Sequence, residues 1–416
     1  MNLEILAYPF IFAAIYFEAF FLVTLLSAPA VASRKRTAST NTPMVAMIVP
    51  CYNEEQTVSG TAESLLALDY PKDKLRIVLV DDGSTDGTAS IMDSFAHHEN
   101  VTVIHQKNQG KHVALNAGIA AAEDAELIGC LDADSFVDAS ALREMIGGFD
   151  DGRVAASTAA MSVHTPRTIL ERMQNAEYIM GIACRHILAA VNGIYVTPGP
   201  FSLYRRDVVV ELGGFRNGHN TEDMEMALRI QKAGYAIESA PLARVFTKTP
   251  RTVPALVKQR TRWTTGFLRN MLNEYRDMVG NPQYGALGLL VLPLGFLAIL
   301  GGIMMFFLVI YQLISQGIQM LMITSGVPVA YTLSTMVPTF ANASWFYLPV
   351  SIFALLGFVA LAGSILFMVV GKNISKTPAQ LSVGVIAYML VYGLIAPFWL
   401  LFSVADVATD NRRAWK

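Results

Sequence analysis

The segment MVAMIVPCYNEE, residues 44–55, decides the fold, because its apolar, β-branched run ends abruptly in polar and acidic residues. Similar apolar runs recur downstream, separated by segments with helical spacing. We predict strands over 45–49, 75–80, 101–105 and 127–131, with helices over 57–68, 85–95 and 111–122. Short strands that alternate with helices predict an α/β fold, in which a mostly parallel sheet carries helices on both faces.

Acidic residues follow three of these strands at the point where each strand ends. They are Glu54 and Glu55 in the first segment, Asp81 and Asp82 in DDGS (81–84), and Asp132 and Asp134 in DAD (132–134). In open sheets of this kind, ligands bind at the carboxyl ends of the strands. A carboxylate there can accept hydrogen bonds from a base or a ribose, and an Asp-x-Asp pair can hold Mg²⁺ or Mn²⁺.

A basic residue stands between two of the acidic clusters. Lys111 follows Asn108, Gln109 and Gly110 at the predicted start of a helix, where the helix dipole also favours a phosphate. Each motif alone is also typical of a plain turn, because Asp and Gly suit turn geometry. Their order along one sheet favours a nucleotide site. No G-x-G-x-x-G follows the first strand and no Walker A lysine motif occurs, which disfavours a dinucleotide dehydrogenase and a P-loop ATPase.

The composition predicts a membrane protein with one polar domain. The chain is 53% hydrophobic and 15% charged, and residues 278–371 contain no Asp, Glu, Lys or Arg. We predict crossings over 5–26, 286–314, 345–370 and 381–404, while 318–340 is either an extra crossing or a re-entrant piece. The chain then divides into a membrane helix (1–30), a polar domain of normal globular size (40–250), an interfacial amphipathic segment (251–283), about three membrane helices (284–405) and a tail (406–416).

Charges beside the crossings predict their orientation. The basic cluster over 34–36 follows the first crossing, so the positive-inside rule places the N-terminus outside and the polar domain in the cytosol. The same count keeps Lys372 in the cytosol but leaves Arg412, Arg413 and Lys416 outside. The predicted location is the plasma or inner cell membrane, in a multi-pass arrangement.

Other polar features narrow the classes of partner. The three cysteines, Cys51, Cys130 and Cys184, have no metal-ligand spacing, and their odd number argues against a disulfide framework. The net charge of −2 gives no electrostatic case for nucleic acid. Glu18 lies within the first crossing and either lines a polar conduit or packs against other helices.

Two further motifs lie near the second membrane part. Thr221, Glu222 and Asp223 open a predicted helix over 224–233, and QRTRW (259–263) lies in a basic amphipathic stretch. The first motif is also ordinary capping chemistry, and the second is also typical of an interfacial helix with snorkelling bases.

Together these residues resemble the family-two inverting glycosyltransferases of the processive, membrane-integrated type. The resemblance is carried by IVPCYNEE (48–55), DDGSTD (81–86), NQGK (108–111), DAD (132–134), GPFSLYR (199–205), TED (221–223) and QRTRW (259–263). It is close to poly-N-acetylglucosamine, chitooligosaccharide and hyaluronan synthases and more distant to cellulose synthases. It implies a GT-A fold, a UDP-sugar donor, a growing polysaccharide acceptor, Mg²⁺ or Mn²⁺, and a channel through the membrane helices.

The resemblance also implies roles for individual residues. The donor would be held by Pro50, Tyr52, Asn53, Glu54, Asp81, Asp82, Lys111, Asp132, Gln259, Arg262 and Trp263. Asp134 would hold the metal ion. The catalytic set would be Asp223 as general base, with Glu222, Arg262 and Asp132. Burial would raise the pKa of Asp223 whereas a helix N-terminus would lower it, and the sequence leaves that balance open.

A departure from the family pattern narrows the donor, and two other functions stay open. PGPFS (198–202) differs from the cellulose synthases, which favours an aminosugar donor, with UDP-N-acetylglucosamine preferred. One alternative is a single transfer to a polyprenyl phosphate or another lipid, against which QRTRW argues. The other is a non-catalytic export subunit, against which the intact acids argue. Accessory subunits are compatible with the synthase and with both alternative functions.

Overall fold

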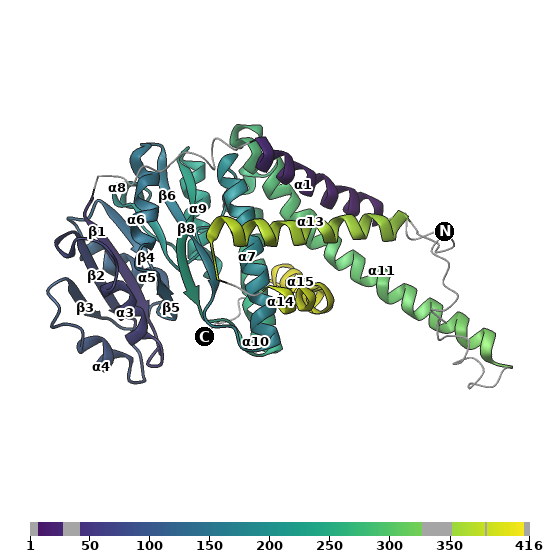
Figure 1. Ribbon diagram of the computed structural model, residues 1–416, viewed down its shortest axis with the longest axis horizontal. Coiled ribbons are helices and arrows are strands. Elements are labelled where there is room, and N and C mark those ends of the chain that lie inside the picture. Colours follow the sequence, from purple (N-terminus) through teal and green to yellow (C-terminus); the bar gives the residue numbers. More distant parts are fainter. Residues whose placement is uncertain (1–6, 28–41, 327–351, 379–380, 412–416) are drawn as a thin grey trace.

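The computed structural model describes residues 7–27, 42–326, 352–378 and 381–411, and it joins an α/β domain to a group of apolar helices (Figure 1). The strands are β1 Val45–Cys51, β2 Leu75–Asp81, β3 Val101–His105, β4 Leu127–Cys130, β5 Ser135–Val137, β6 Val154–Val163, β7 Ser202–Arg205 and β8 Ala236–Thr247. The helices of the domain are α3 Val58–Leu66, α4 Thr88–Asp93, α5 Lys111–Ala120, α6 Ala141–Ile146, α7 Ile169–Ala190, α8 Arg206–Glu211, α9 Glu222–Lys232 and α10 Val253–Leu272. The apolar helices are α1 Tyr8–Ser27, α11 Leu292–Thr324, α13 Ile352–Ser375, α14 Ser382–Ala387 and α15 Gly393–Ala408, with π-helical turns at Leu287–Val291 and Tyr388–Tyr392.

One eight-stranded sheet forms the centre of the domain, in the order β3-β2-β1-β4-β7-β6-β8-β5. The four strands predicted from the sequence are parallel neighbours, and β6 also pairs in parallel with β8. The predicted mostly parallel sheet is confirmed, although β7 and β5 add antiparallel pairings that make it mixed. Cys51 pairs with Asp81 in register, so β1 and β2 end level and their polar ends share one edge.

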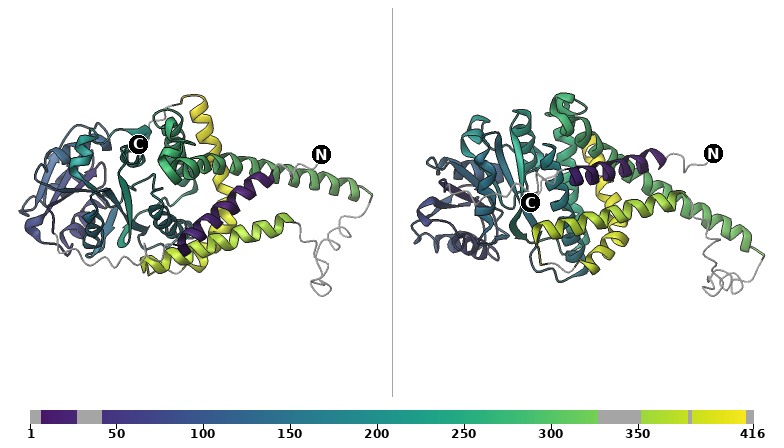
Figure 2. Two further views of the ribbon diagram at one scale, coloured as in Figure 1. Left: turned by 90° about the horizontal axis from the view of Figure 1, so that it is seen from above. Right: turned by 45° about the horizontal axis from the view of Figure 1, so that its top comes forward.

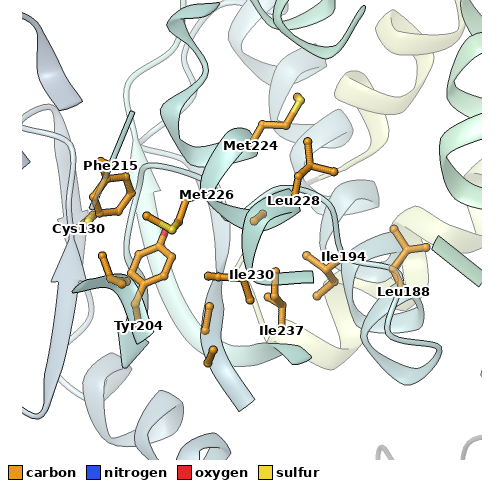
Figure 3. Close-up of a cluster of buried hydrophobic side chains, with 14 of the residues drawn as sticks. Cys130, Leu188, Ile194, Tyr204, Phe215, Met224, Met226, Leu228, Ile230 and Ile237 are labelled. Atoms are coloured by element: carbon orange, nitrogen blue, oxygen red, sulfur yellow. The ribbon is translucent and has the colours of Figure 1, made fainter. Parts of the chain in front are cut away.

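Helices cover both faces of the sheet, as predicted. Alternate residues of β1 point to opposite faces, so Met47 and Val49 join one buried cluster with α3 and α6, whereas Ile48 joins the other with α5, α7 and α9. Figure 3 shows the second cluster, where Met226 and Ile230 of α9 pack beside Tyr204. The three cysteines are free: Cys51 and Cys130 are buried, and Cys184 is partly buried.

Helix α7 joins the sheet to the membrane part. It begins at a capping box, in which the Thr168 side chain accepts from the Glu171 N–H and the Glu171 carboxylate accepts from the Thr168 N–H. Its backbone lies against two apolar helices at glycines, because Gly371 of α13 faces the Ile179 carbonyl and Gly384 of α14 faces the Arg172 carbonyl. A side chain at either glycine would collide with that backbone.

Among the described residues, four helices are long and apolar enough to cross a bilayer, namely Tyr8–Ser27, Leu287–Met322, Leu355–Ser375 and Ser382–Ala408, which makes this a membrane protein. Helix α11 continues without a break to Thr324, so the start of the segment 318–340 extends that helix, and its remainder lies outside the described residues. The carboxylate of Glu18 packs against Gly363 of α13, where a Cβ would lie 2.5 Å from Oε2. This contact favours packing against another helix as the role of Glu18.

The apolar helices have two orientations. Helices α1, α11 and α13 project away from the domain, whereas α14 and α15 run across them, beside α7 and α10 (Figure 2).

We expect Gly371→Ala to destabilise the protein by about 1 to 3 kcal/mol, since overpacking a tight contact costs that much. The unfolding temperature of the detergent-purified protein measures the effect. The matched control is Gly357→Ala in the same helix, where an added Cβ meets nothing within 4 Å. Equal unfolding temperatures for the two variants would contradict the close contact between α13 and α7.

Candidate active site

Asp82 fixes the loop that leads into α5. Its carboxylate accepts hydrogen bonds from Gln106 Nε2 at 2.7 Å and from the N–H groups of Gln109 at 3.0 Å and Gly110 at 2.9 Å. The side chain is buried, and both of its oxygens are engaged by the protein. Asp82 therefore holds the loop before α5 in place, at the edge of the sheet where the nucleotide is predicted to bind. Its predicted contact with the base or the ribose stays a prediction.

Asp81 is held from two directions. It accepts from the Ser84 N–H at 2.9 Å and faces His105 Nδ1 at 3.1 Å, while His105 Nε2 lies 2.9 Å from Asp93. Although burial opposes it, hydrogen bonds from Ser84 and His105 lower the pKa of Asp81. Hydrogen bonds to Asp81 and Asp93 raise the pKa of His105.

The loop after β1 is tied to the loop after β2. Asn53, which has a positive φ of 56°, donates its N–H to Ser84 Oγ and accepts from the Thr85 N–H at 2.8 Å. Glu54 donates its N–H to Thr88 Oγ1 at 2.7 Å. Tyr52 is 37% exposed, so its ring is free to meet a ligand. Pro50, at the end of β1, pairs in register with Val80.

Lys111 joins three elements at this edge. It is the first residue of α5, and its Nζ lies 2.5 Å from Asp132 Oδ1 and 2.8 Å from Glu222 Oε1 at the start of α9. Although burial opposes its charge, Asp132 and Glu222 raise the pKa of Lys111 well above its usual value. The backbone of Gly199 covers the pair, because a Cβ there would lie 2.7 Å from Asp132 Oδ2 and 2.8 Å from Lys111 Nζ. Lys111 thus bonds carboxylates here, at the position predicted to meet phosphates.

Asp134 lies close to other carboxylates at this edge of the sheet. Burial, then the neighbouring charges of Asp132 and Glu54, raise the pKa of Asp134 to about 7. It accepts from Ser135 Oγ at 3.1 Å and Thr247 Oγ1 at 3.4 Å. Within the described part of the chain, no three His, Cys, Asp or Glu side chains are arranged to hold a metal ion. The donors nevertheless fit Mg²⁺ or Mn²⁺, which are commonly bound by one or two carboxylates together with substrate phosphates.

Asp223 lies in the first turn of α9, beside Glu222. Burial, followed by the charge of Glu222, raises the pKa of Asp223 to about 6. Burial has a larger effect on this pKa than the hydrogen bond from the Met224 N–H at the start of the helix, which lowers it. The Thr197 hydroxyl, which accepts from Tyr204 Oη at 2.9 Å, donates to the Asp223 carbonyl at 2.9 Å. Thr197 was missed by sequence reasoning, since no motif marks it.

Helix α10 brings Arg262 to the same carboxylates. Gly266 lies so close to Thr221 that a Cβ would be 2.5 Å from Thr221 Oγ1, and Asn270 Nδ2 donates to that oxygen at 3.2 Å. One turn before Gly266, Arg262 donates to the Asn220 carbonyl at 3.3 Å. Its charge lowers the pKa of Glu222, although Lys111 has the larger effect among the opposing charges. Asn270 is another contributor that no sequence motif indicated.

Two other residues of the QRTRW motif, Gln259 and Trp263, contact Arg260 of the same helix. Gln259, Arg262 and Trp263 share a helix face by their spacing. Gln259 Oε1 accepts from Arg260 Nη1 at 3.2 Å, and the Arg260 guanidinium lies 4.2 Å from the centre of the Trp263 ring. Arg260 is buried and paired with Glu177 at 2.7 Å, so one face of Trp263 is covered by a fixed cation.

The first part of this site matches a known family. Residues 46–213 match the family model Glycosyl transferase family 2. Over this stretch, which is less than half of the chain, the protein is similar to the family 2 glycosyltransferases. The match ends before Glu222, Asp223 and α10, so their place in the site rests on the geometry above.

The relatives with similar sequences are polysaccharide synthases. Over 237 residues the chain is 33% identical to a poly-beta-1,6-N-acetyl-D-glucosamine synthase of Staphylococcus aureus (strain COL). It is 32% identical to the enzyme of that name from Staphylococcus epidermidis. Each alignment covers 56% of this chain and 56% of the relative, so the chain spans about half the length of the curated relatives it matches.

A solved structure supports the fold. A mannosyltransferase from Pyrobaculum calidifontis, in complex with GDP-Man and Mn2+, superposes with a TM-score of 0.55 over 97% of this chain and 99% of the other, at 18% identity. The mixed sheet with helices on both faces is thus of the GT-A type.

We expect the bridge from Asp81 through His105 to Asp93 to make stability depend on pH. The raised pKa of His105 means that its contribution is complete below 6.5 and disappears as the pH rises through the folded-state value. The lowered pKa of Asp81 means that its contribution to stability is present above pH 3.8 and is lost as the pH falls. The unfolding temperatures of the unmodified protein and His105→Gln should therefore differ most between pH 3.8 and pH 6.5 and converge at higher pH.

The matched control for this measurement is His98→Gln, because His98 contacts no carboxylate among the described residues. A temperature difference for His105→Gln that stays constant with pH would contradict the ionic part of the bridge.

Proposed function

We propose that this chain is a membrane-integrated, inverting glycosyltransferase that polymerises a β-linked polysaccharide from a UDP-sugar. The convergence of Lys111, Asp132, Glu222, Asp223 and Arg262 at one edge of the sheet carries this proposal. A diphosphate leaving group needs cations, and an attacking hydroxyl needs a base. This edge offers both within a few side chains of each other.

The donor would lie along the ends of β1, β2 and β4. Pro50, Tyr52, Asn53, Glu54, Asp81 and Asp82 would surround the base and the ribose. Lys111 and Arg262 would face the diphosphate, and the fork of Arg262 suits two phosphate oxygens at once. Gln259 would support this end of α10. When the donor arrives, Lys111 would exchange part of its contact with Asp132 and Glu222 for phosphate oxygens.

A divalent cation, Mg²⁺ or Mn²⁺, would be held by Asp134, with Asp132 beside it. The raised pKa of Asp134, caused by burial and by neighbouring carboxylates, supports this assignment, because a cation would relieve the same repulsion. The mannosyltransferase of this fold was solved with Mn2+. Bound there, the ion would neutralise charge on the donor diphosphate.

Asp223 would act as the general base. Its pKa of about 6, raised by burial and Glu222, leaves it ionised at neutral pH yet basic enough to take a proton. The acceptor hydroxyl oxygen would bond to the anomeric carbon as the bond from that carbon to the diphosphate breaks. The hydroxyl proton would pass to Asp223, and UDP would leave with the bonding electrons. A single displacement of this kind inverts the anomeric configuration.

The product would leave toward the membrane. Trp263 would present its free face to the terminal sugar of the acceptor, since its other face is covered by Arg260. We propose a cytosolic domain with several bilayer crossings beside it, through which the growing chain would pass. The aminosugar synthases that resemble this chain support UDP-N-acetylglucosamine as donor. Accessory subunits are compatible with this arrangement.

The size of the product tests the function. Membranes that contain the protein should incorporate label from UDP-N-acetylglucosamine into an extended polysaccharide, and a panel of other UDP-sugars should give less. A product limited to one sugar on a lipid would replace the proposal with the single-transfer alternative. No incorporation from any UDP-sugar would favour the export subunit.

Asp223→Asn should abolish transfer and leave UDP binding intact, because the amide keeps the shape of the side chain but cannot take a proton. We expect the rate to fall by about 10² or more, the usual contribution of a general base. Isothermal titration with UDP measures the binding. The matched control is Asp207→Asn, since Asp207 and Asp223 both lie in the first turn of a helix and both accept from the next N–H at 2.8 Å. Retained turnover in Asp223→Asn would remove Asp223 from the mechanism.

A further inference from the structure

The last apolar segment, Ser382–Ala408, contacts the α/β domain along its length. Near its start, Gly384 packs against the Arg172 carbonyl of α7, and near its middle Tyr392 Oη donates to Glu177 Oε1 of α7 at 2.9 Å. Near its end, Arg269 Nη2 of α10 donates to the carbonyls of Asp406 and Asn411 at 3.1 Å. Between these points, Ser403 Oγ donates to the Thr261 carbonyl at 3.2 Å. The segment therefore follows the surface of the domain along much of its length.

The helices that it follows carry charges that a hydrocarbon layer would exclude. The Glu177 and Arg260 pair lies beside its middle, next to Tyr392, and Arg269 lies beside its end. If the segment crossed the bilayer, one or other of these groups would be carried into the hydrocarbon core. Burying a charge there is expensive. The orientation in Figures 1 and 2 agrees, because α14 and α15 run across the three helices that project from the domain.

The opposite face of the segment is an exposed apolar stripe. It consists of Ile386, Leu390, Leu394, Phe398 and Phe402, which are between 44% and 68% exposed and recur every four residues. The face toward α7 and α10 is buried, with Trp399 at 5% and Asp406 at 2% exposed. One side of the segment thus fits a protein surface, and the other fits lipid.

We propose that Ser382–Ala408 lies in the surface of the bilayer, on the side of the glycosyltransferase domain, and does not cross the membrane. The occupant of the apolar stripe is the lipid of that leaflet. Helices α1, α11 and α13 are then the crossings among the described residues. The sequence instead predicts a crossing over 381–404. That prediction uses length and hydropathy, which do not show which residues pack against the buried face of the helix.

Two consequences follow. Asn411, the last described residue, lies on the domain side; because Arg412, Arg413 and Lys416 come next in the sequence, a cytosolic domain agrees with the positive-inside rule. In addition, the bilayer surface supports α10 through this segment, which places Trp263 at a fixed depth near the membrane. The inference concerns membrane topology and holds whichever sugar is transferred.

Sidedness tests the inference directly. Single cysteines are introduced as Glu123→Cys in the domain, Ala343→Cys between α11 and α13, and Ala414→Cys in the tail. They are labelled with a membrane-impermeant maleimide in intact spheroplasts and in inverted vesicles, and the unmodified chain gives the background. We expect the Ala414→Cys variant to react from the same side as Glu123→Cys and from the opposite side to Ala343→Cys. Labelling of Ala414→Cys together with Ala343→Cys would overturn the inference.

A depth measurement gives a second, independent result. Ile386→Cys and Phe402→Cys carry spin labels at the two ends of the stripe, about 24 Å apart along a helix at 1.5 Å per residue. Their accessibility to oxygen and to a water-soluble nickel reagent should match, since both lie at one depth. A spanning segment would place the labels at clearly different depths, which would overturn the inference. Lys416→Cys replaces Ala414→Cys if that variant does not accumulate, and UDP binding confirms that each variant is folded.

Discussion

A lysine held between two carboxylates organises the candidate active site. Lys111 connects the start of α5, the end of β4 and the start of α9 through Asp132 and Glu222. Without this cation, the acids of three elements would repel one another in a poorly solvated place. Burial and neighbouring carboxylates raise the pKa values of Asp223 and Asp134, although the charge of Lys111 opposes this rise at both groups. The cluster is therefore suited to accept a diphosphate, a divalent cation and a proton.

Helix α10 connects this cluster to the membrane part. On one side, Gly266 and Asn270 fit against Thr221 at the start of α9, which brings Arg262 to the carboxylates. On the other side, Arg260 pairs with Glu177, and Ser403 of α15 bonds to the Thr261 carbonyl. A movement of α10 relative to the sheet would therefore move Arg262 and Trp263 relative to the donor. The same helix can serve chemistry and membrane attachment because its two faces have different neighbours.

The apolar helices are of two kinds, although their compositions are alike. Helices α1 and α13 pack against each other and α7, with Gly363 and Gly371 at close approaches, and α11 packs against α1 and, at Gly302 and Phe306, against α15. Helices α14 and α15 contact charged helices of the domain instead. If an apolar helix that packs against charged helices crossed the bilayer, it would bring those charges into the hydrocarbon core. The residues that an apolar helix contacts therefore decide, together with its composition, whether it crosses.

The sequence by itself determined the parallel half of the sheet and the shared edge of its acidic ends. These features depend on local period and on strand order, which a linear pattern contains. It did not determine the antiparallel pairing of β5 and β7, strands of three and four residues whose partners are distant in the chain. Only the tertiary structure decided that Asp82 holds a loop, that Lys111 pairs with Glu222, that burial raises the pKa of Asp223, and that the last apolar segment follows the domain. Each of these depends on distances and burial between residues far apart in sequence, and such quantities exist only once the chain has packed.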